Sequence, residues 1–376
     1  MTQTIVVLGG SFAGIQLAHR LVKNTRKSVK DLKVILVSTN SHFYWNLASV
    51  RAIIPGILKD EDFTQSIEKG FAQYPSDAFE FIVGTAKEAD IDAKTVKVAL
   101  VGGEGGERVL SYDHLVLATG TRTAGADAVP WKANGTHEEI LDTLHRTAEK
   151  VKAAKHIVVA GAGATGVETA GELGFEYRKN KEIVLLSGDA KLLGGDSLSS
   201  NAESELKKLD VTIKTSARVE STTTLPDGKT EITLKNGEKI VTDLYLPTMG
   251  MLPNTEYLPE KVLREDKFVA VDEFYRVKNA NNVWAAGDIV WLPRGSYVLT
   301  DKQAAGVAKN IDLVLRNKNP TPVKTLPMDV LMATVGRSRG VGRMGSVKVF
   351  SYMVYTIKGK TLGVQALPGM VNGTSY

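Results

Sequence analysis

Two glycine-rich segments of this chain could hold the phosphates of a nucleotide. Residues 9–14 read GGSFAG and residues 161–166 read GAGATG, and each segment follows a run of apolar residues. In such a turn the backbone N–H groups can approach a pyrophosphate, and the N-terminus of the following helix adds about half a positive charge. The predicted chemistry is therefore the binding of two dinucleotides.

The two segments fit the pattern G-x-G-x-x-G to different degrees. The second fits it fully, whereas the first has Ser11 at the middle glycine, where a small side chain still permits close approach of a phosphate. A single motif of this kind is an ordinary tight turn about as often as it is a nucleotide-binding turn. Two copies, each between a predicted strand and a predicted helix, make the ordinary turn a weaker alternative. The candidate contacts are Gly9, Gly10, Ser11, Phe12, Ala13 and Gly14 in the first copy, and Gly161, Gly163, Ala164, Thr165 and Gly166 in the second.

The surrounding residues predict the elements that position these turns. Apolar runs at residues 5–8 and 157–160 precede the turns, helical patterns follow, and further apolar runs occupy residues 34–37 and 183–186. The copies start 157 − 5 = 152 residues apart. Continuous hydrophobicity is typical of parallel strands covered on both faces. The sequence therefore predicts an α/β fold with two Rossmann-like dinucleotide-binding domains.

The acidic residue that usually holds a ribose is missing from both second strands. Ser38 and Ser187 stand at those positions. A serine hydroxyl can still hydrogen-bond a ribose, although less well than a carboxylate. The choice between NADH and NADPH therefore stays open.

Composition excludes several classes of function. The chain has 376 residues, enough for two or three domains, and a formal charge of 47 − 42 = +5. This charge suits anionic cofactors and an acidic membrane surface, and without a dense Lys/Arg block we do not expect a nucleic-acid partner. The absence of cysteine excludes disulfides, thiolate zinc sites and thiol catalysis.

The chain ends and the apolar stretches give an expected location. A strand pattern begins directly after Met1, and Thr2 stands where N-myristoylation would need glycine, so neither a leader peptide nor a myristoyl group is expected. No apolar stretch approaches the roughly 20 residues of a spanning helix. We therefore expect a cytoplasmic protein, and peripheral attachment to membranes stays open.

Later motifs resemble those of the glutathione-reductase-like flavoproteins, which have two nucleotide domains. These motifs are the segments 118–120 (ATG) and 286–288 (AGD). The resemblance implies FAD in the first domain and NADH or NADPH in the second. It assigns the FAD site to Ala118, Thr119, Gly120, Gly287 and Asp288, with the Asp288 carboxylate on the ribityl chain. A helix N-cap is the alternative role for Asp288, and the two roles are compatible.

Residues 46–52 (NLASVRA) and 166–168 (GVE) are similar to apoptosis-inducing-factor-like flavoproteins, in particular to the ferroptosis-suppressor type NAD(P)H:quinone oxidoreductases. The resemblance implies that Arg51 contacts the cofactor, with a surface salt bridge as the alternative. It implies that Ala86 lies beside the adenine. Glu168 would lie near the contact of nicotinamide and flavin, with a carboxylate on the helix surface as the alternative. Gly250 ends the segment of the second domain that corresponds to Gly120.

The missing cysteines decide how electrons would leave the flavin. Disulfide reductases of this superfamily use a pair of cysteines as a relay, and this chain has none. The flavin must then pass electrons directly to an acceptor, and a quinone suits such a two-electron transfer. No acid or base catalyst and no metal site is predicted. The rival function is a flavoprotein that acts mainly as an NAD(P)H-sensitive switch for a partner or nucleic acid.

The predicted domains are residues 1–123 with 255–316 for FAD, 124–254 for NAD(P)H, and 317–376 as a C-terminal α+β cap that faces the acceptor or a membrane. Within the cap, residues 347–355 could touch a lipid surface or pack into a C-terminal sheet or helix. Residues 42–45 could form an aromatic wall beside the flavin or part of the core. A more distant resemblance, to type II NADH dehydrogenases, implies that Gln303 could face a quinone. Assembly into a homodimer also stays open.

Overall fold

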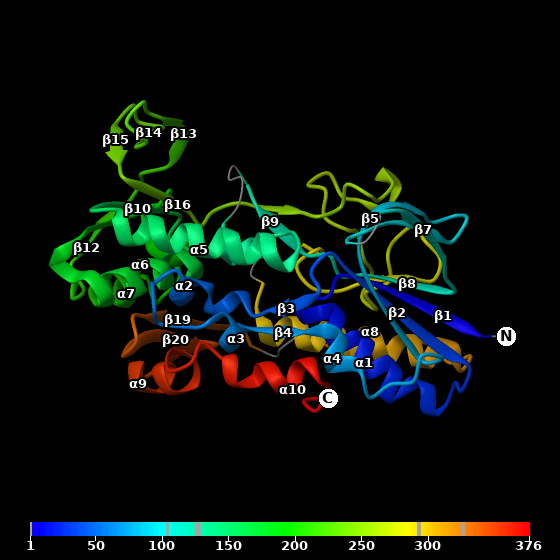
Figure 1. Ribbon diagram of the computed structural model, residues 1–376. Helices are drawn as coiled ribbons and strands as arrows, with labels where there is room; N and C mark the ends of the chain where they lie inside the picture. The colour runs from blue at the N-terminus through cyan, green and yellow to red at the C-terminus, as the bar shows by residue number, and fades with distance from the viewer. Residues whose placement is uncertain (1, 103–104, 125–128, 292–294, 325–327) are drawn as a thin grey trace.

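The protein is described by a computed structural model that covers residues 2–102, 105–124, 129–291, 295–324 and 328–376. Two sheets with parallel cores carry helices on their faces, and a smaller antiparallel sheet with short helices follows at the C-terminus (Figure 1). This arrangement confirms the predicted α/β class with two Rossmann-like units and a small C-terminal α+β part.

The first unit is built on a seven-stranded sheet. Its strands, in spatial order, are β18 (Val283–Ala285), β8 (His114–Leu117), β1 (Gln3–Leu8), β2 (Leu32–Ser38), β5 (Phe79–Asp90), β6 (Thr95–Leu100) and β7 (Glu107–Ser111). The strands from β18 to β5 pair in parallel, and β5 then bends to pair antiparallel with β6. Residues 5–8 of β1 are fully buried, as continuous hydrophobicity predicts for a strand covered on both faces.

Helices α1 (Phe12–Lys23) and α8 (Tyr297–Leu315) pack against each other beside this sheet. Between the second and third parallel strands the chain forms a series of short elements. These are β3 (His42–Tyr44), η2 (Asn46–Ala48), α2 (Ser49–Ala52), α3 (Asp60–Phe63), β4 (Thr64–Ser66) and α4 (Ile67–Phe71). Two further short turns of helix lie elsewhere in this unit, η1 (Thr25–Lys27) and η6 (Glu260–Val262).

The second unit has four parallel strands in the order β12 (Val211–Lys214), β11 (Glu182–Leu186), β10 (His156–Ala160) and β16 (Leu244–Pro247). Its helical elements are α5 (His137–Ala153), α6 (Ala164–Tyr177), η4 (Arg178–Asn180), η5 (Leu192–Gly195) and α7 (Ser199–Lys207). A small antiparallel sheet of β13 (Val219–Thr224), β14 (Thr230–Leu234) and β15 (Lys239–Thr242) stands at one end of it (Figure 1). Helix α5 begins at a capping box, because Thr136 Oγ1 accepts from the backbone N–H of Glu139 and the Glu139 carboxylate accepts from that of Thr136.

Two short antiparallel strands, β9 (Thr121–Thr123) and β17 (Met251–Pro253), join the two units where the chain crosses between them. The turn η3 (Pro130–Lys132) follows the first crossing. The strands of the seven-stranded and the four-stranded sheet lie within the ranges predicted for the FAD and NAD(P)H domains, whereas the domain boundaries themselves stay predictions.

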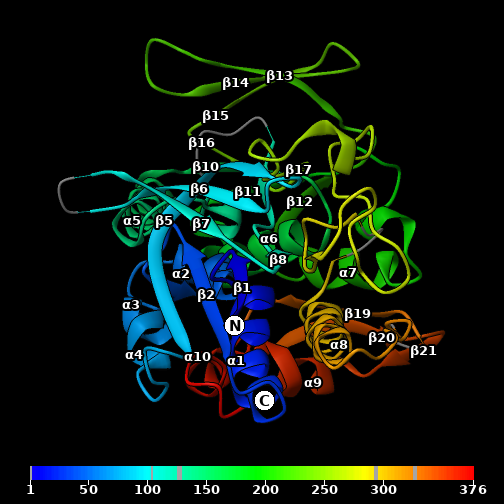
Figure 2. The same cartoon turned by 90° about the vertical axis from the view of Figure 1, so that its right-hand side faces the viewer.

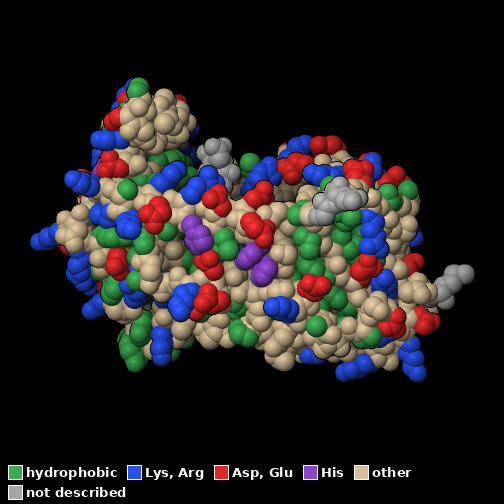
Figure 3. All heavy atoms as spheres, in the orientation of Figure 1, with side chains coloured by type: hydrophobic (Ala, Val, Ile, Leu, Met, Phe, Trp, Pro, Cys, Tyr) green, Lys and Arg blue, Asp and Glu red, His purple; other side chains and the backbone are tan. Residues whose placement is uncertain are grey.

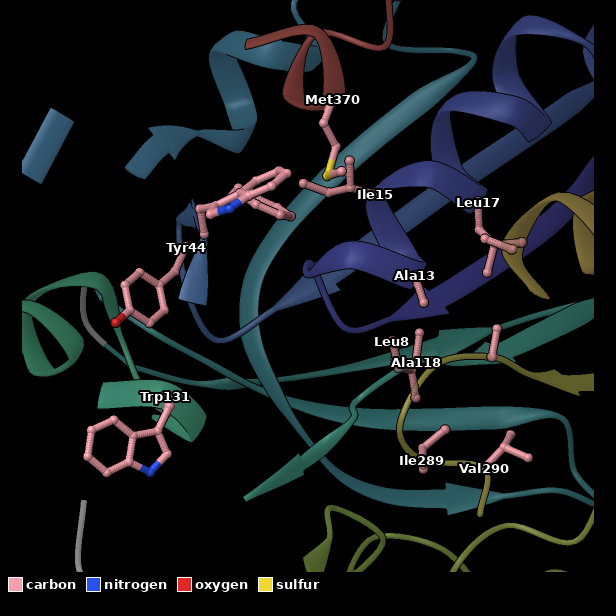
Figure 4. Close-up of a cluster of buried hydrophobic side chains, with 14 of the residues drawn as sticks. Leu8, Ala13, Ile15, Leu17, Tyr44, Ala118, Trp131, Ile289, Val290 and Met370 are labelled. Carbon is pink, nitrogen blue, oxygen red and sulfur yellow. The ribbon is translucent and has the colours of Figure 1, made fainter. Parts of the chain in front are cut away.

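The C-terminal part consists of β19 (Val330–Val335), β20 (Arg339–Met344) and β21 (Val347–Val349), followed by α9 (Ser351–Val354), η7 (Tyr355–Gly359), η8 (Val364–Ala366) and α10 (Leu367–Val371). Its last helix returns to the first unit and lies beside α1 (Figure 2). In the core between them, Met370 of α10 lies against Ile15 of α1 (Figure 4). Within the described ranges, none of the helices has both the length and the apolar content needed to cross a bilayer.

The aromatic residues after the second strand are mostly part of the core. Phe43 and Trp45 are buried, and the ring of Phe12 lies edge-on to both, with centroids 5.0 and 5.1 Å away. The Tyr44 hydroxyl donates to the Pro130 carbonyl at 2.9 Å. Packing therefore accounts for these three side chains, whereas His42 lies at the surface, stacked on His137 at 3.8 Å.

Two histidines are buried in the first unit. His19 has no exposed surface, and its ring nitrogens lie 2.9 Å from the Tyr74 hydroxyl and 2.9 Å from the Val371 carbonyl oxygen. His114 is 4% exposed, and the Trp284 indole donates to its Nδ1 at 3.4 Å. Burial lowers the pKa of each imidazole from its ordinary value of 6.5 to about 4.

These lowered pKa values predict a loss of stability in mild acid. As the pH falls below 6.5, the two imidazoles become protonated in the unfolded chain but stay neutral in the folded protein. The stabilisation is complete above about pH 6.5 and decreases towards pH 4, by up to roughly 3 kcal/mol for each histidine. Urea denaturation at about pH 7.5 and 4.5 measures the loss, which should be smaller in His19→Gln than in the unmodified chain. An equal loss in both proteins would contradict the assignment.

Candidate nucleotide-binding site

The two glycine-rich turns have the same stereochemistry. Gly9, after β1, has φ 111°, and Gly161, after β10, has φ 107°, values that residues with side chains rarely adopt. A Cβ atom on Gly14 would lie 1.8 Å from the Gly9 carbonyl oxygen, and one on Gly166 would lie 1.8 Å from the Gly161 oxygen. Each helix can therefore begin this close to its turn only if the last residue of the motif is glycine.

The middle position of the motif is open in both copies. Ser11 is the N-cap of α1 and Gly163 is the N-cap of α6, and both have negative φ, at −104° and −71°. Serine thus fits the backbone without strain, and its side chain makes no capping hydrogen bond. A Cβ atom on Gly163 would meet no atom within 4 Å. This space over a helix N-terminus suits a phosphate group.

The predicted FAD residues converge at the carboxyl ends of neighbouring strands. A Cβ atom on Gly9 would lie 2.2 Å from the Ala118 carbonyl oxygen, and one on Gly287 would lie 3.1 Å from Cβ of Ala13. Ser38 ends β2 beside the first turn, since a Cβ atom on Gly10 would lie 2.6 Å from its Cβ. These ends meet where strand order changes direction at β1, the usual position of ligands in open α/β sheets.

Ala86 lies near this edge but outside the parallel part of the sheet. The parallel register of β2 and β5 ends at Ser38 and Val83, and Ala86 pairs with Val98 beside a bulge in the antiparallel part of β5. Its contact with the adenine stays a prediction.

The segments 118–120 and 250–254 hold each other in place. The Asn254 side chain donates to the Thr119 carbonyl at 2.8 Å, and its backbone N–H donates to the Gly120 carbonyl at 3.0 Å. The Thr119 hydroxyl donates back to the Asn254 carbonyl at 2.8 Å. No local pattern indicates the role of Asn254, because its partners lie more than 130 residues away in the chain. Gly250, at φ 73°, packs closely on Ala124 beside this contact.

Asp288 is partly exposed and forms an ion pair with Lys132 of η3. Helix α8 does not use it as an N-cap, because Ser296 has that role and accepts from the Leu299 N–H at 3.2 Å. The N-cap alternative for Asp288 is therefore wrong. A carboxylate at this edge can still accept hydrogen bonds from sugar-alcohol hydroxyls.

Gln303 has no exposed surface and supports the Gly-Asp turn. Its Oε1 accepts from the Gly287 N–H at 2.8 Å, and its Nε2 donates to the Tyr275 hydroxyl at 3.3 Å. Both amide atoms are engaged, so the interpretation of Gln303 as a quinone-facing side chain is wrong.

In the second unit, Glu168 lies beneath the C-terminal part. It is 6% exposed, and its Oε1 accepts from Lys358 Nζ at 2.6 Å and from the Thr334 N–H at 3.1 Å. The alternative of a carboxylate on the helix surface is therefore wrong. Lys358 was not predicted as a site residue, because nothing in its local sequence indicates a partner on α6. Ser187 also uses its hydroxyl locally, donating to the Lys191 carbonyl at 3.2 Å.

Arg51 joins three parts of the molecule. Its Nε and Nη2 donate to Glu172 Oε1 at 3.0 and 2.7 Å, and its Nη2 and Nη1 donate to the carbonyls of Gly359 and Lys360 at 2.8 and 3.1 Å. Arg51 is 4% exposed and Glu172 is fully buried. The salt bridge of Arg51 is therefore buried and does not lie at the surface. The contact of Arg51 with a cofactor stays a prediction.

Comparisons with known proteins agree with this geometry. A family model described as pyridine nucleotide-disulphide oxidoreductase matches residues 3–314. The chain is 43% identical to oxidoreductase ptaL of Pestalotiopsis fici, over 98% of this chain and 99% of the relative. It is 27% identical to ferroptosis suppressor protein 1 of Homo sapiens, over 96% and 93%. The solved sulfide:quinone oxidoreductase of Aquifex aeolicus superposes with a TM-score of 0.77 at 17% identity, covering 99% of this chain and 92% of that one.

Proposed function

The chain belongs to the pyridine nucleotide-disulphide oxidoreductase family, and on that basis we propose that it uses NADH or NADPH to reduce a quinone-type acceptor through FAD. The family match establishes a flavoprotein oxidoreductase that depends on a pyridine nucleotide. The observation that supports the proposal best is the pair of stereochemically equal turns, each at the N-terminus of a helix on its own parallel sheet.

The residues present fit the two cofactors. Bound FAD would accept a hydride and release two electrons to the next acceptor. Ser11 and the backbone N–H groups at the start of α1 would hold its pyrophosphate, Ser38 its ribose, and Asp288 its ribityl chain. The turn that contains Gly163 would hold the pyrophosphate of the nicotinamide nucleotide in the second unit.

The proposal of a quinone rests on the absence of thiols and on the relatives. The sequence has no cysteine, so no dithiol relay can carry electrons from the flavin site to a disulfide substrate. The protein then acts by positioning the reacting rings and excluding water. The name of the Aquifex aeolicus neighbour includes a quinone, which supports the same class of acceptor at the level of fold.

Glu168 and Lys358 are the charged groups we place nearest to the nicotinamide. Their ion pair fixes the first turns of α6 against η7 and leaves little net charge there. We assign this pair to holding the helix that binds the nucleotide in the orientation that hydride transfer needs.

Steady-state oxidation of NADH and NADPH with a soluble quinone tests the proposal. We expect a yellow protein whose flavin absorbance bleaches on anaerobic addition of NADH and returns on addition of quinone. Turnover slower than roughly one per minute with every acceptor, together with DNA binding that weakens with salt, would favour the switch function instead.

Asp288→Ala should weaken FAD binding about 10- to 100-fold, because a hydrogen bond to a charged acceptor contributes about 1.5–3 kcal/mol. Fluorescence titration of the apoprotein with FAD measures the change. The control is Asp301→Ala on α8, which removes a carboxylate that forms a partly exposed ion pair with Arg20. Equal affinities in the two variants would remove Asp288 from the FAD site.

A further inference from the structure

We propose that the C-terminal part docks on an anionic lipid surface through a ridge of apolar side chains. In the free protein these side chains are exposed to solvent. The ridge consists of Val347, Phe350, Tyr352, Met353 and Ile357. Val347 is 68% exposed, Phe350 80% and Tyr352 72%. Five large apolar side chains exposed within eleven residues of the chain favour an interaction surface over ordinary surface composition.

The fold forces these side chains outwards. Residues 351–359 form a continuous helical stretch over β20, and Val354 is its fully buried contact. Gly340 and Gly342 make room for it, since Cβ atoms there would lie 2.5 and 2.7 Å from the Val354 methyl groups. With Val354 against the sheet, Tyr352, Met353 and Ile357 remain in solvent. In Figure 3, hydrophobic side chains protrude at the lower left, where Figure 1 places α9.

The charge of this region favours an anionic partner. Residues 330–376 contain six lysines and arginines and no aspartate or glutamate, so the rest of the chain carries 41 − 42 = −1. The entire net positive charge of the protein therefore lies in its last 47 residues. Basic groups beside an apolar surface are the combination that binds peripheral proteins to anionic membranes.

Three of these cations form close ion pairs within the protein, and among the described residues the other three do not. Arg337, Arg343 and Lys358 pair with carboxylates of other segments. Lys348 donates to the neutral Asn201 side chain, and among the described residues neither it nor Lys360 has a carboxylate within ion-pair distance. The Arg339 side chain is 57% exposed, and its Nε lies 3.6 Å from a carboxylate oxygen of Glu205.

A lipid surface explains the ridge better than a protein groove would. The ridge protrudes, so a flat and deformable surface can cover it without a matching cavity. Phe and Tyr side chains are suited to the boundary between headgroups and acyl chains. The contact would be peripheral, in keeping with the absence of a spanning helix among the described residues.

The buried side of residues 351–360 contacts the candidate nucleotide-binding site. Lys358 pairs with Glu168, and the carbonyls of Gly359 and Lys360 accept from Arg51. A lipid-soluble acceptor could then approach the flavin from the docked face. This link rests on the proposed function, whereas the lipid contact itself does not.

Co-sedimentation of the full chain with vesicles, without nucleotide or quinone, tests the proposal. We expect binding to phosphatidylcholine vesicles that contain phosphatidylglycerol and weak binding to phosphatidylcholine alone. Val347→Ser with Phe350→Ser should weaken binding at least about tenfold. Val347→Ser alone has a matched control in Val109→Ser, which changes a valine that is 62% exposed on β7, far from the ridge in the sequence, and should leave binding unchanged.

Equal binding of the ridge variant and the unmodified chain, or no preference for the anionic vesicles, would overturn the proposal. So would sedimentation velocity without lipid that shows a dimer which the ridge variant converts to monomer, because the ridge would then be an interface between two copies. Anaerobic flavin reduction in solution is measured separately, so that a failure of the proposed oxidoreductase function is not mistaken for a failure of lipid binding.

Discussion

Replacing Gly166 with alanine is expected to leave FAD bound and to slow its reduction by NADH about 100-fold or more. The new Cβ atom would lie 1.8 Å from the Gly161 carbonyl oxygen and 2.7 Å from Thr248 Oγ1. The turn must open to relieve this overlap, which moves the start of α6 away from the pyrophosphate. Stopped-flow bleaching of the flavin under anaerobic conditions measures the rate, and the absorbance spectrum of the purified protein measures FAD content.

Gly14→Ala makes the same change in the first turn and should have the opposite signature. Its Cβ atom would also lie 1.8 Å from a carbonyl oxygen, that of Gly9, so the protein should be purified with little flavin. Gly163→Ala is the control for folding, because its Cβ atom meets no protein atom within 4 Å. If this variant binds NADH more weakly, the added methyl group must lie close to the bound nucleotide. If Gly166→Ala lost the flavin and Gly14→Ala kept it, the assignment of the two nucleotides would have to be exchanged.

The turns could be predicted because their requirements are local. A helix that begins four residues after the end of a strand needs glycine directly after the strand and again in the first turn of the helix, and the local sequence shows both glycines. The burial of residues 5–8 and 157–160 follows from their continuous hydrophobicity in the same way. The capping box of α5 is equally local, since its two partners, Thr136 and Glu139, are three residues apart.

The partners of the charged residues could not be predicted, because they come from distant parts of the chain. Glu168 and Lys358 are 190 residues apart, and Arg51 and Glu172 are 121 apart. The sequence indicates that a buried charge needs a partner but not which residue supplies it. The roles considered for Gln303 and for Asp288 as an N-cap failed for the same reason, since each depends on how α8 meets the turn before it.

The second large effect is expected at the junction around Glu172, where the two units and the C-terminal part meet. Glu172→Leu would leave Arg51 buried without its carboxylate and should destabilise the protein by about 3–5 kcal/mol. Urea denaturation followed by circular dichroism measures the change. Glu176→Gln is the control on the same helix, because Glu176 forms a partly exposed ion pair with Arg337 and its loss should cost less than about 1 kcal/mol.

A double variant shows whether the unpaired charge causes the loss. Arg51→Leu combined with Glu172→Leu removes both charges, so it should recover a substantial part of the stability that Glu172→Leu alone loses. Arg337 still has Glu176 as its second partner in that variant. Helix α6 packs closely on the C-terminal part, since a Cβ atom on Gly171 would lie 2.8 Å from the Gly336 nitrogen. A disturbed junction should therefore displace α6, and the single variant should also slow flavin reduction by NADH. If the double variant were as unstable as the sum of the two single ones, Glu172 would stabilise the junction through packing and not through charge.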